Sequence, residues 1–164
     1  MKNILILIFV PILSFSQSAE DFLKKGIEKN KSNDFYGAIS DFSQAIKINP
    51  NYGKAFSMRA LSKAKLNDNS GVIEDMTIAI HLNSNEENSV RFIDYSTRGI
   101  SKIKTNDLNG ALADFNKVVE LNPNDSDSYL SRGIVKKQLN RNGCIDFKTA
   151  CDLGNCQFYN DYCK

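Results

Sequence analysis

The residues of this 164-residue chain that are best suited to chemistry are its four cysteines and its single histidine. All four cysteines lie within the last 21 residues: Cys144, Cys151, Cys156 and Cys163. Such a cluster can form disulfides, hold a zinc ion or act as a redox pair. Because His81 is the single histidine, a metal site with several histidine ligands is excluded, and any Ser-His-Asp catalytic triad would have to use His81. We therefore expect no catalytic residue, no metal and no cofactor.

Disulfides are the favoured use of the cysteines. A Cys₄ zinc site usually contains close Cys-x₂₋₄-Cys pairs, and a redox pair usually has a Cys-x-x-Cys motif; both spacings are absent, so these uses rank lower. The spacings are 7, 5 and 7 residues, and seven residues make about two helical turns. A glycine and an asparagine between the second and third cysteines indicate a helix stop and a turn.

If the chain doubles back at this turn, the cysteines pair in a nested pattern, Cys144–Cys163 and Cys151–Cys156. Other pairings would join partners about 10 Å apart along a helix axis, beyond the roughly 7 Å limit between Cα atoms.

Residues 1–16 have the composition of a secretory signal peptide. Lys2 gives a positive start, residues 4–13 form an apolar core, and small residues follow up to Ser16. The core is shorter than the roughly 20 apolar residues that span a bilayer. We expect cleavage after Ser16 or Ser18, export to the periplasm or the secreted space, and no integral membrane span in the mature chain. An uncleaved anchor is the alternative.

Composition narrows the class of protein further. A content of 41% hydrophobic residues is too apolar for a disordered chain, and the length suggests one domain. The formal net charge is only +2, so the chain lacks the basic excess typical of proteins that bind nucleic acid.

The rest of the chain repeats itself. Small residues recur with intervals of 34, 39 and 34 residues, at Gly26, Ala60, Gly99 and Gly133. A large apolar residue lies four positions before each one: Phe22, Phe56, Tyr95 and Tyr129. A second apolar series follows further along the chain at Phe42, Met76 and Phe115. Two apolar stripes within a 34-residue period predict stacked helix-turn-helix units, in which the small residue lets the two helices approach closely. The turns inside the units are marked by Asn-Asp pairs such as Asn33-Asp34, which offer caps for the second helix.

Segments 38–50 and 111–123 resemble the tetratricopeptide repeat (TPR) family, and the resemblance covers residues 19–153. It implies an all-α, TPR-like α-solenoid of about four repeats, near 19–50, 53–84, 92–123 and 126–153. Residues 154–164 are expected to form a disulfide-bonded capping helix over the exposed face of the last unit. The five extra residues in the middle predict a longer linker near 84–89.

Charged residues repeat in step with the small ones. One position before each small residue is a lysine or arginine: Lys25, Arg59, Arg98 and Arg132. Three positions after each small residue is a lysine: Lys29, Lys63, Lys102 and Lys136. Aspartates recur at Asp41, Asp75, Asp114 and Asp146. Because anion and cation repeat together, an ion pair inside each unit is favoured over the alternative, a basic ladder for an acidic ligand.

The resemblance places the partner-binding groove on the concave wall lined by the first helices. The wall positions are Leu23, Ile27, Ser57, Leu61, Ser96, Ile100, Leu130 and Ile134, flanked by Lys31, Lys65, Lys104 and Lys137. Such a strip would bury an apolar peptide or helix face, and the lysines would help to orient an acidic one. The alternative is that part of the strip is core between neighbouring units.

The implied function is a non-catalytic protein- or peptide-binding module of the cell envelope or secreted space. A structural subunit of an envelope assembly, acting through its convex surface, is the alternative. One subgroup of the family clamps a C-terminal carboxylate with asparagines and lysines. The position after each small residue holds an isoleucine or leucine here, so no asparagine stands where that clamp needs one.

Overall fold

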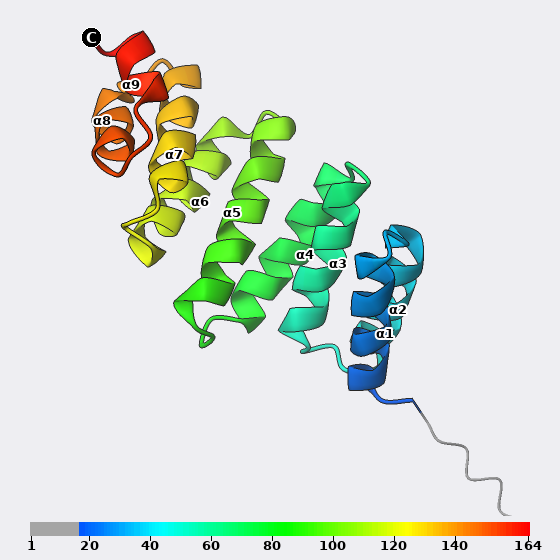
Figure 1. The fold of residues 1–164 in the computed structure, drawn as a ribbon. Helices are drawn as coiled ribbons and strands as arrows, with labels where there is room; N and C mark the ends of the chain where they lie inside the picture. Colours follow the sequence, from blue (N-terminus) through cyan, green and yellow to red (C-terminus); the bar gives the residue numbers. More distant parts are fainter. Residues whose placement is uncertain (1–16) are drawn as a thin grey trace, which may run out of the picture.

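The computed structural model describes residues 17–164, which form a stack of helices without any strand (Figure 1). The helices are α1 (Ala19–Lys31), α2 (Phe35–Ile48), α3 (Gly53–Lys65), α4 (Asn69–Leu82), α5 (Asn88–Lys104), α6 (Leu108–Leu121), α7 (Ser126–Gln138), α8 (Cys144–Asp152) and α9 (Gln157–Tyr162). Each helix packs mainly against its neighbours in the chain, as in a solenoid. The all-α prediction is confirmed. The predicted signal peptide, residues 1–16, lies outside the described residues.

The turn inside each unit has the same construction. An asparagine with a positive φ ends the first helix, at Asn33, Asn67, Asn106 and Asn140, with φ between 55° and 64°. Asparagine tolerates this left-handed conformation better than most residues do. In the first three units an aspartate follows, and its side chain accepts a hydrogen bond from the backbone N–H three residues on; Asp34, for example, accepts from Gly37 at 2.9 Å. The predicted cap of the second helix is therefore confirmed.

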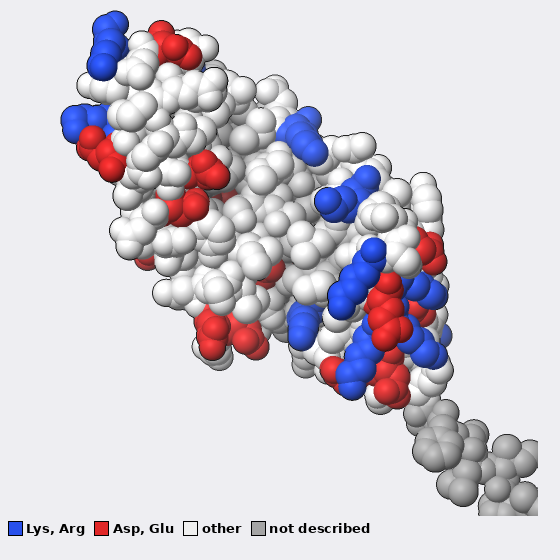
Figure 2. Space-filling model, viewed as in Figure 1, with Lys and Arg blue, Asp and Glu red and all other residues white. Residues whose placement is uncertain are grey.

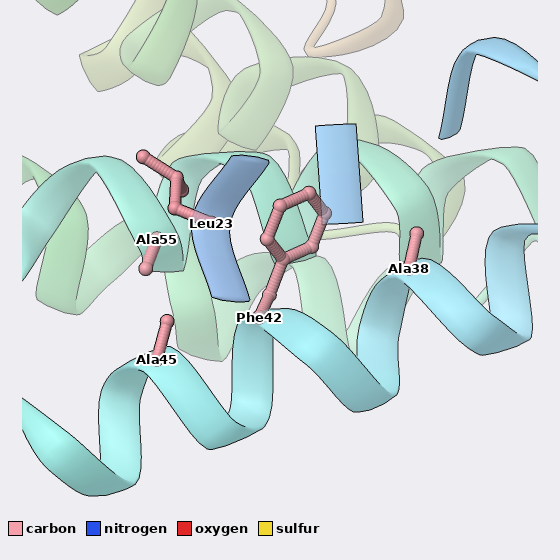
Figure 3. Close-up of a cluster of buried hydrophobic side chains, with 5 residues drawn as sticks. All are labelled: Leu23, Ala38, Phe42, Ala45 and Ala55. Carbon is pink, nitrogen blue, oxygen red and sulfur yellow. The ribbon is translucent and has the colours of Figure 1, made fainter. Parts of the chain in front are cut away.

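The small residue of each unit packs near a large buried side chain of its second helix. A Cβ added at Gly26 would lie 2.5 Å from the Phe42 ring, so only glycine lets α1 and α2 come this close. Figure 3 shows Phe42 beside Leu23, with Ala38, Ala45 and Ala55 around them. Where the second unit has alanine in place of glycine, the residue opposite is the flexible Met76 rather than phenylalanine.

The five-residue insertion lengthens a helix more than a linker. The connection between α4 and α5 spans residues 83–87, one residue more than the connections at 49–52 and 122–125. The difference lies in α5, which has 17 residues where α1 and α3 have 13. The expected long linker near 84–89 is thus mostly an extra helical turn, because continuing the helix satisfies its backbone hydrogen bonds.

The repeated charges form ion triads inside the units. In the second unit Asp75 pairs with Arg59 at 2.6 Å and with Lys63 at 2.9 Å. The same triad recurs in the third and fourth units: Arg98, Lys102 and Asp114, then Arg132, Lys136 and Asp146. In the first unit Lys29 alone pairs with Asp41, at 2.7 Å, and Lys25 lies over the Phe22 ring. These cations are held by their own aspartates, so the ion-pair interpretation is confirmed over the basic ladder.

The C-terminal cap has the nested disulfides that the spacing predicted. Cys144 is bonded to Cys163 and Cys151 to Cys156, with Cα atoms 5.6 and 3.8 Å apart. The short helix α9 packs on α8 through an aromatic cluster: Phe147, Phe158 and Tyr162. This contact covers the last unit, whose second helix would otherwise expose Phe147. Over residues 17–164, none of the helices has the length and apolar character needed to cross a bilayer.

Candidate functional site

The four first helices lie side by side and run in the same direction, and we call the surface they form the first-helix face (α1, α3, α5 and α7). Cross-unit hydrogen bonds fix this register: Ser57 in the first half of α3 bonds to Asp94 in the first half of α5. Few charged side chains lie over the middle of the molecule, around α5, whereas many gather over α1 and α2 (Figure 2). The middle of this face is therefore the part best suited to apolar contacts.

Two predicted wall residues lie in the interior. Leu23 is only 1% exposed and belongs to the core between α1, α2 and α3 (Figure 3). Ser57 is also buried, and its hydroxyl donates to Asp94 Oδ1 at 2.8 Å. Leu23 points into the junction with the next unit, which is the alternative that part of the strip is core between units. Ser57 lies at the bottom of a hollow between α3 and α5.

The other predicted wall residues retain some exposure. Ile27 and Leu61 are half-buried against the cores of their own units, and Leu130 and Ile134 are half-buried as well. Ser96 and Ile100 line a pocket. The flanking lysines Lys31, Lys65, Lys104 and Lys137 are exposed at the C-terminal ends of the first helices, and Lys137 lies over the Tyr162 ring of the cap. The structure therefore brings Ser96, Ile100 and Leu61 to hollows of this face.

The pocket at Ile100 lies between α5 and α7, above α6. It has a volume of about 240 Å³ and is lined by Phe92, Ser96 and Ile100 of α5, with Asp127 and Ser128 of α7 on the opposite side. Ile100 is 48% exposed, so an isoleucine side chain stands open to solvent at its edge. We call this hollow the Ile100 pocket.

A larger hollow of about 420 Å³ lies between α3 and α5, and we call it the Asp94 pocket. Its walls are mostly apolar, with Tyr52, Met58, Leu61, Leu82, Val90 and Ile93 among them. Ile93 is 48% exposed and lies seven residues, about two turns, before Ile100 on the same side of α5. The extra turn of α5 and the α4–α5 connection form one side of this pocket.

Three polar side chains meet at the Asp94 pocket. Asp94 is 1% exposed; its Oδ1 accepts from Ser57 and its Oδ2 accepts from Asn83 Nδ2, both at 2.8 Å. Asn83 Nδ2 also donates to Ser57 Oγ at 3.2 Å. Burial raises the pKa of Asp94 above its ordinary carboxyl value, and the two hydrogen bonds offset only part of that rise.

Asp94 differs from the other buried aspartates. Asp41, Asp75, Asp114 and Asp146 each have a lysine or arginine at salt-bridge distance. In residues 17–164 no ion pair is formed by Asp94. Sequence reasoning missed this residue, although a signal was visible: Asp94 stands outside the repeated cation–aspartate spacing, next to the insertion.

Tyr52 is a second missed residue. Its hydroxyl donates to the Glu20 carboxylate of α1, so it joins the first unit to the rim of the Asp94 pocket. Burial, with the Glu20 hydrogen bond next in importance, raises the pKa of Tyr52 to about 12. His81 is exposed in the last turn of α4, and no group of three metal-ligating side chains occurs in the described part of the chain.

Comparisons with known proteins agree with this architecture. Residues 95–125 match the sequence model of the tetratricopeptide repeat family. No curated protein matches the chain. The solved structure of the first TPR of Spaghetti (RPAP3) bound to the HSP90 peptide SRMEEVD is 23% identical, with a TM-score of 0.68 over 76% of this chain and 95% of that one.

Two further solved structures are similar. The Arabidopsis OM64 TPR domain is 21% identical, with a TM-score of 0.65 over 73% of this chain and 94% of that chain. MamA from Desulfovibrio magneticus, residues 41 to the end, is 15% identical, with a TM-score of 0.73 over 83% of this chain and 75% of that one. At these sequence identities, the similarity to the solved structures shows that the fold is shared. The chain therefore contains a tetratricopeptide repeat at residues 95–125 and has the fold of the TPR solenoids.

Proposed function

We propose that this protein is a non-catalytic binding module that holds a protein or peptide partner along the middle of its first-helix face. The observation that carries the proposal is the pair of adjacent pockets on either side of α5, with Ile93 and Ile100 exposed between them. Apolar side chains of a partner would gain most by burial there, because the surrounding face carries few charges (Figure 2).

One of the similar structures supports a binding role. RPAP3 was solved with an HSP90 peptide, and its fold is shared by this chain. Ile27, Leu61, Ile100 and Ile134 stand at the position that the carboxylate clamp needs for asparagine, so we propose recognition by apolar contacts in place of that clamp.

The test is a matched pair of isoleucine variants. Ile100→Glu places a charge on the first-helix face, and Ile78→Glu places one on α4, where the isoleucine is similarly exposed (48% against 42%). Wild type and both variants, shown to be folded by circular dichroism, are used to capture partners from the native envelope fraction. Loss of a captured protein with Ile100→Glu alone supports the proposal. Retention with Ile100→Glu contradicts it.

A second candidate role is that of a structural subunit in an envelope assembly, acting through the second helices. Exposed apolar side chains on these helices favour it: Tyr36, Ile48 and Ile78. Loss of partners with Ile78→Glu, but not with Ile100→Glu, would support this role instead.

We further propose that the protein is exported and acts in the periplasm or the secreted space. The two disulfides are compatible with an oxidising compartment. The mass of the protein recovered from its native host tests this proposal. A mature chain that begins at Gln17 or Ala19 supports export, and an intact N-terminus contradicts cleavage.

A further inference from the structure

The side chains of the Asp94 pocket indicate which chemical group of a partner it would bind. This inference rests on the proposed binding function. Asp94 is buried and carries no cation partner in residues 17–164, whereas the four other buried aspartates each have one. A buried carboxylate without a counter-charge is unfavourable, and a cation that enters the pocket would relieve this cost. Ser57 and Asn83 hold the carboxylate in place without neutralising it.

The shape and surroundings of the pocket complement a cation on an apolar stem. Its walls include Met58, Leu61, Val90 and Ile93, which suit a chain of methylene groups, and Tyr52 adds an aromatic ring that favours an ammonium group. The lining as a whole carries Lys54, Glu86 and Asp94, so it has one more negative charge than positive.

The edge of the first-helix face at this pocket is also acidic. Four acidic residues lie at this edge of α5 and α7: Glu86 and Glu87 before α5, Asp125 at the N-cap of α7 and Asp127 in its first turn. Two basic residues, Lys54 and Arg91, lie in the first turns of α3 and α5, and the predicted flanking lysines stand at the opposite ends of the first helices. In Figure 2 acidic side chains gather at the end of α5 where the chain arrives from α4. A basic group is therefore attracted to the edge that contains the Asp94 pocket.

We propose that the Asp94 pocket binds a lysine side chain of the partner, with the methylene stem against the apolar walls and the ammonium group paired with Asp94. Lysine fits better than arginine because each oxygen of Asp94 already accepts a hydrogen bond. A compact ammonium needs one free lone pair, whereas the planar guanidinium fork binds best to a carboxylate whose two oxygens are both free.

Peptide libraries with one fixed central residue test this proposal. Five libraries of heptapeptides, acetylated and amidated, carry lysine, norleucine, Nε-acetyl-lysine, arginine or glutamate at the centre of otherwise random sequences. Norleucine keeps the apolar stem and lacks the charge. We expect the full chain to retain about tenfold more of the lysine library than of the norleucine library, as for the weaker buried charge pairs.

Asp94→Asn is the matched variant, because it removes the charge and keeps the shape. Its side-chain oxygen can still accept from Asn83, and its amide can donate to Ser57, whose hydroxyl lies 3.4 Å from the Gly53 carbonyl oxygen and can donate there instead. We expect the lysine-to-norleucine ratio of this variant to fall to about one, because the charge that favours the lysine library is gone.

Each outcome decides a specific point. Equal retention of the lysine and norleucine libraries by the wild type, or a lysine preference that survives in Asp94→Asn, overturns the lysine pocket. Stronger retention of the arginine library overturns the choice of lysine. If the libraries bind regardless of the central residue and Ile100→Glu abolishes that binding, the peptide-binding function stands and the lysine pocket falls. If no library binds the wild type, both proposals fail.

Discussion

Replacing Asp114 by asparagine should destabilise the protein strongly, because it leaves two cations without their partner. Asp114 Oδ1 lies 2.6 Å from Arg98 Nη2, and Oδ2 lies 2.9 Å from Lys102 Nζ. The carboxylate side chain is 3% exposed, and those of the arginine and lysine are 14% and 15% exposed. Removal of one partner from a buried ion pair costs roughly 3–5 kcal/mol.

We expect a loss near the lower end, about 3 kcal/mol, because both cations keep some contact with water and with other acceptors. Arg98 also donates to Thr77 at 3.2 Å, and Lys102 to the Gly110 carbonyl oxygen at 3.5 Å. For a domain of this size such a loss lowers the melting temperature by about 6–12 °C.

Urea unfolding followed by circular dichroism at 222 nm measures the effect. Two matched variants accompany it. Asp94→Asn also removes a buried aspartate charge but strands no cation, so its urea midpoint should equal or exceed that of the wild type. Asp152→Asn breaks the exposed pair with Lys148 and should be indistinguishable from the wild type. A loss below about 1 kcal/mol for Asp114→Asn, or an equal loss for Asp94→Asn, would refute the reasoning.

The glycine contacts, the outer disulfide and the Tyr52 hydroxyl can each be tested by a single substitution. Gly133→Ala should lower the free energy of unfolding by about 1–3 kcal/mol, because the added Cβ would lie 2.5 Å from the buried Phe147 ring. Gly99→Ala, whose Cβ would lie 3.1 Å from the Phe115 ring, should lower it less in the same urea titration. Cys144→Ser should cost about 3 kcal/mol and speed amide exchange in α9, measured by mass spectrometry, and unchanged exchange would show that the outer disulfide does not fasten the cap. The pKa of Tyr52 rises from 10.0 to about 12 on folding, so its stabilising contribution is complete below pH 10.0 and disappears as the pH rises to about 12. Tyr52→Phe should flatten this part of the curve of stability against pH, and an unchanged slope would contradict the assignment.

The parts of the fold that depend on local spacing could be predicted from the sequence. Three features of the sequence concern only two helices joined by a short turn: the 34-residue period, the glycine that packs against a phenylalanine, and the aspartate 16 residues after an arginine. The nested disulfides belong to the same class, because helix geometry alone decides which cysteines face each other.

The parts that depend on how one unit rests on the next could not be predicted in this way. Leu23 and Ser57 occupy the repeat position at which the third unit has the half-buried Ser96, and contact with the following unit buries them. The insertion extends α5 along one side of the Asp94 pocket, whereas the sequence pattern predicts a longer linker there. The repeat pattern predicts the features that all units share, whereas the Asp94 pocket lies where the third unit differs from the others.

The closure of each ion triad inside its own unit has a consequence for how such a chain changes over evolutionary time. Duplication of the second or third unit copies the aspartate together with its arginine and lysine, so the ion triad of the new unit is complete and the triads of its neighbours are unchanged. The fourth unit differs, because its second helix is tied to α9 by disulfides and aromatic packing. Lineages of this architecture can therefore gain internal units without breaking an ion triad, whereas loss of the fourth unit would remove the disulfide partners of α9.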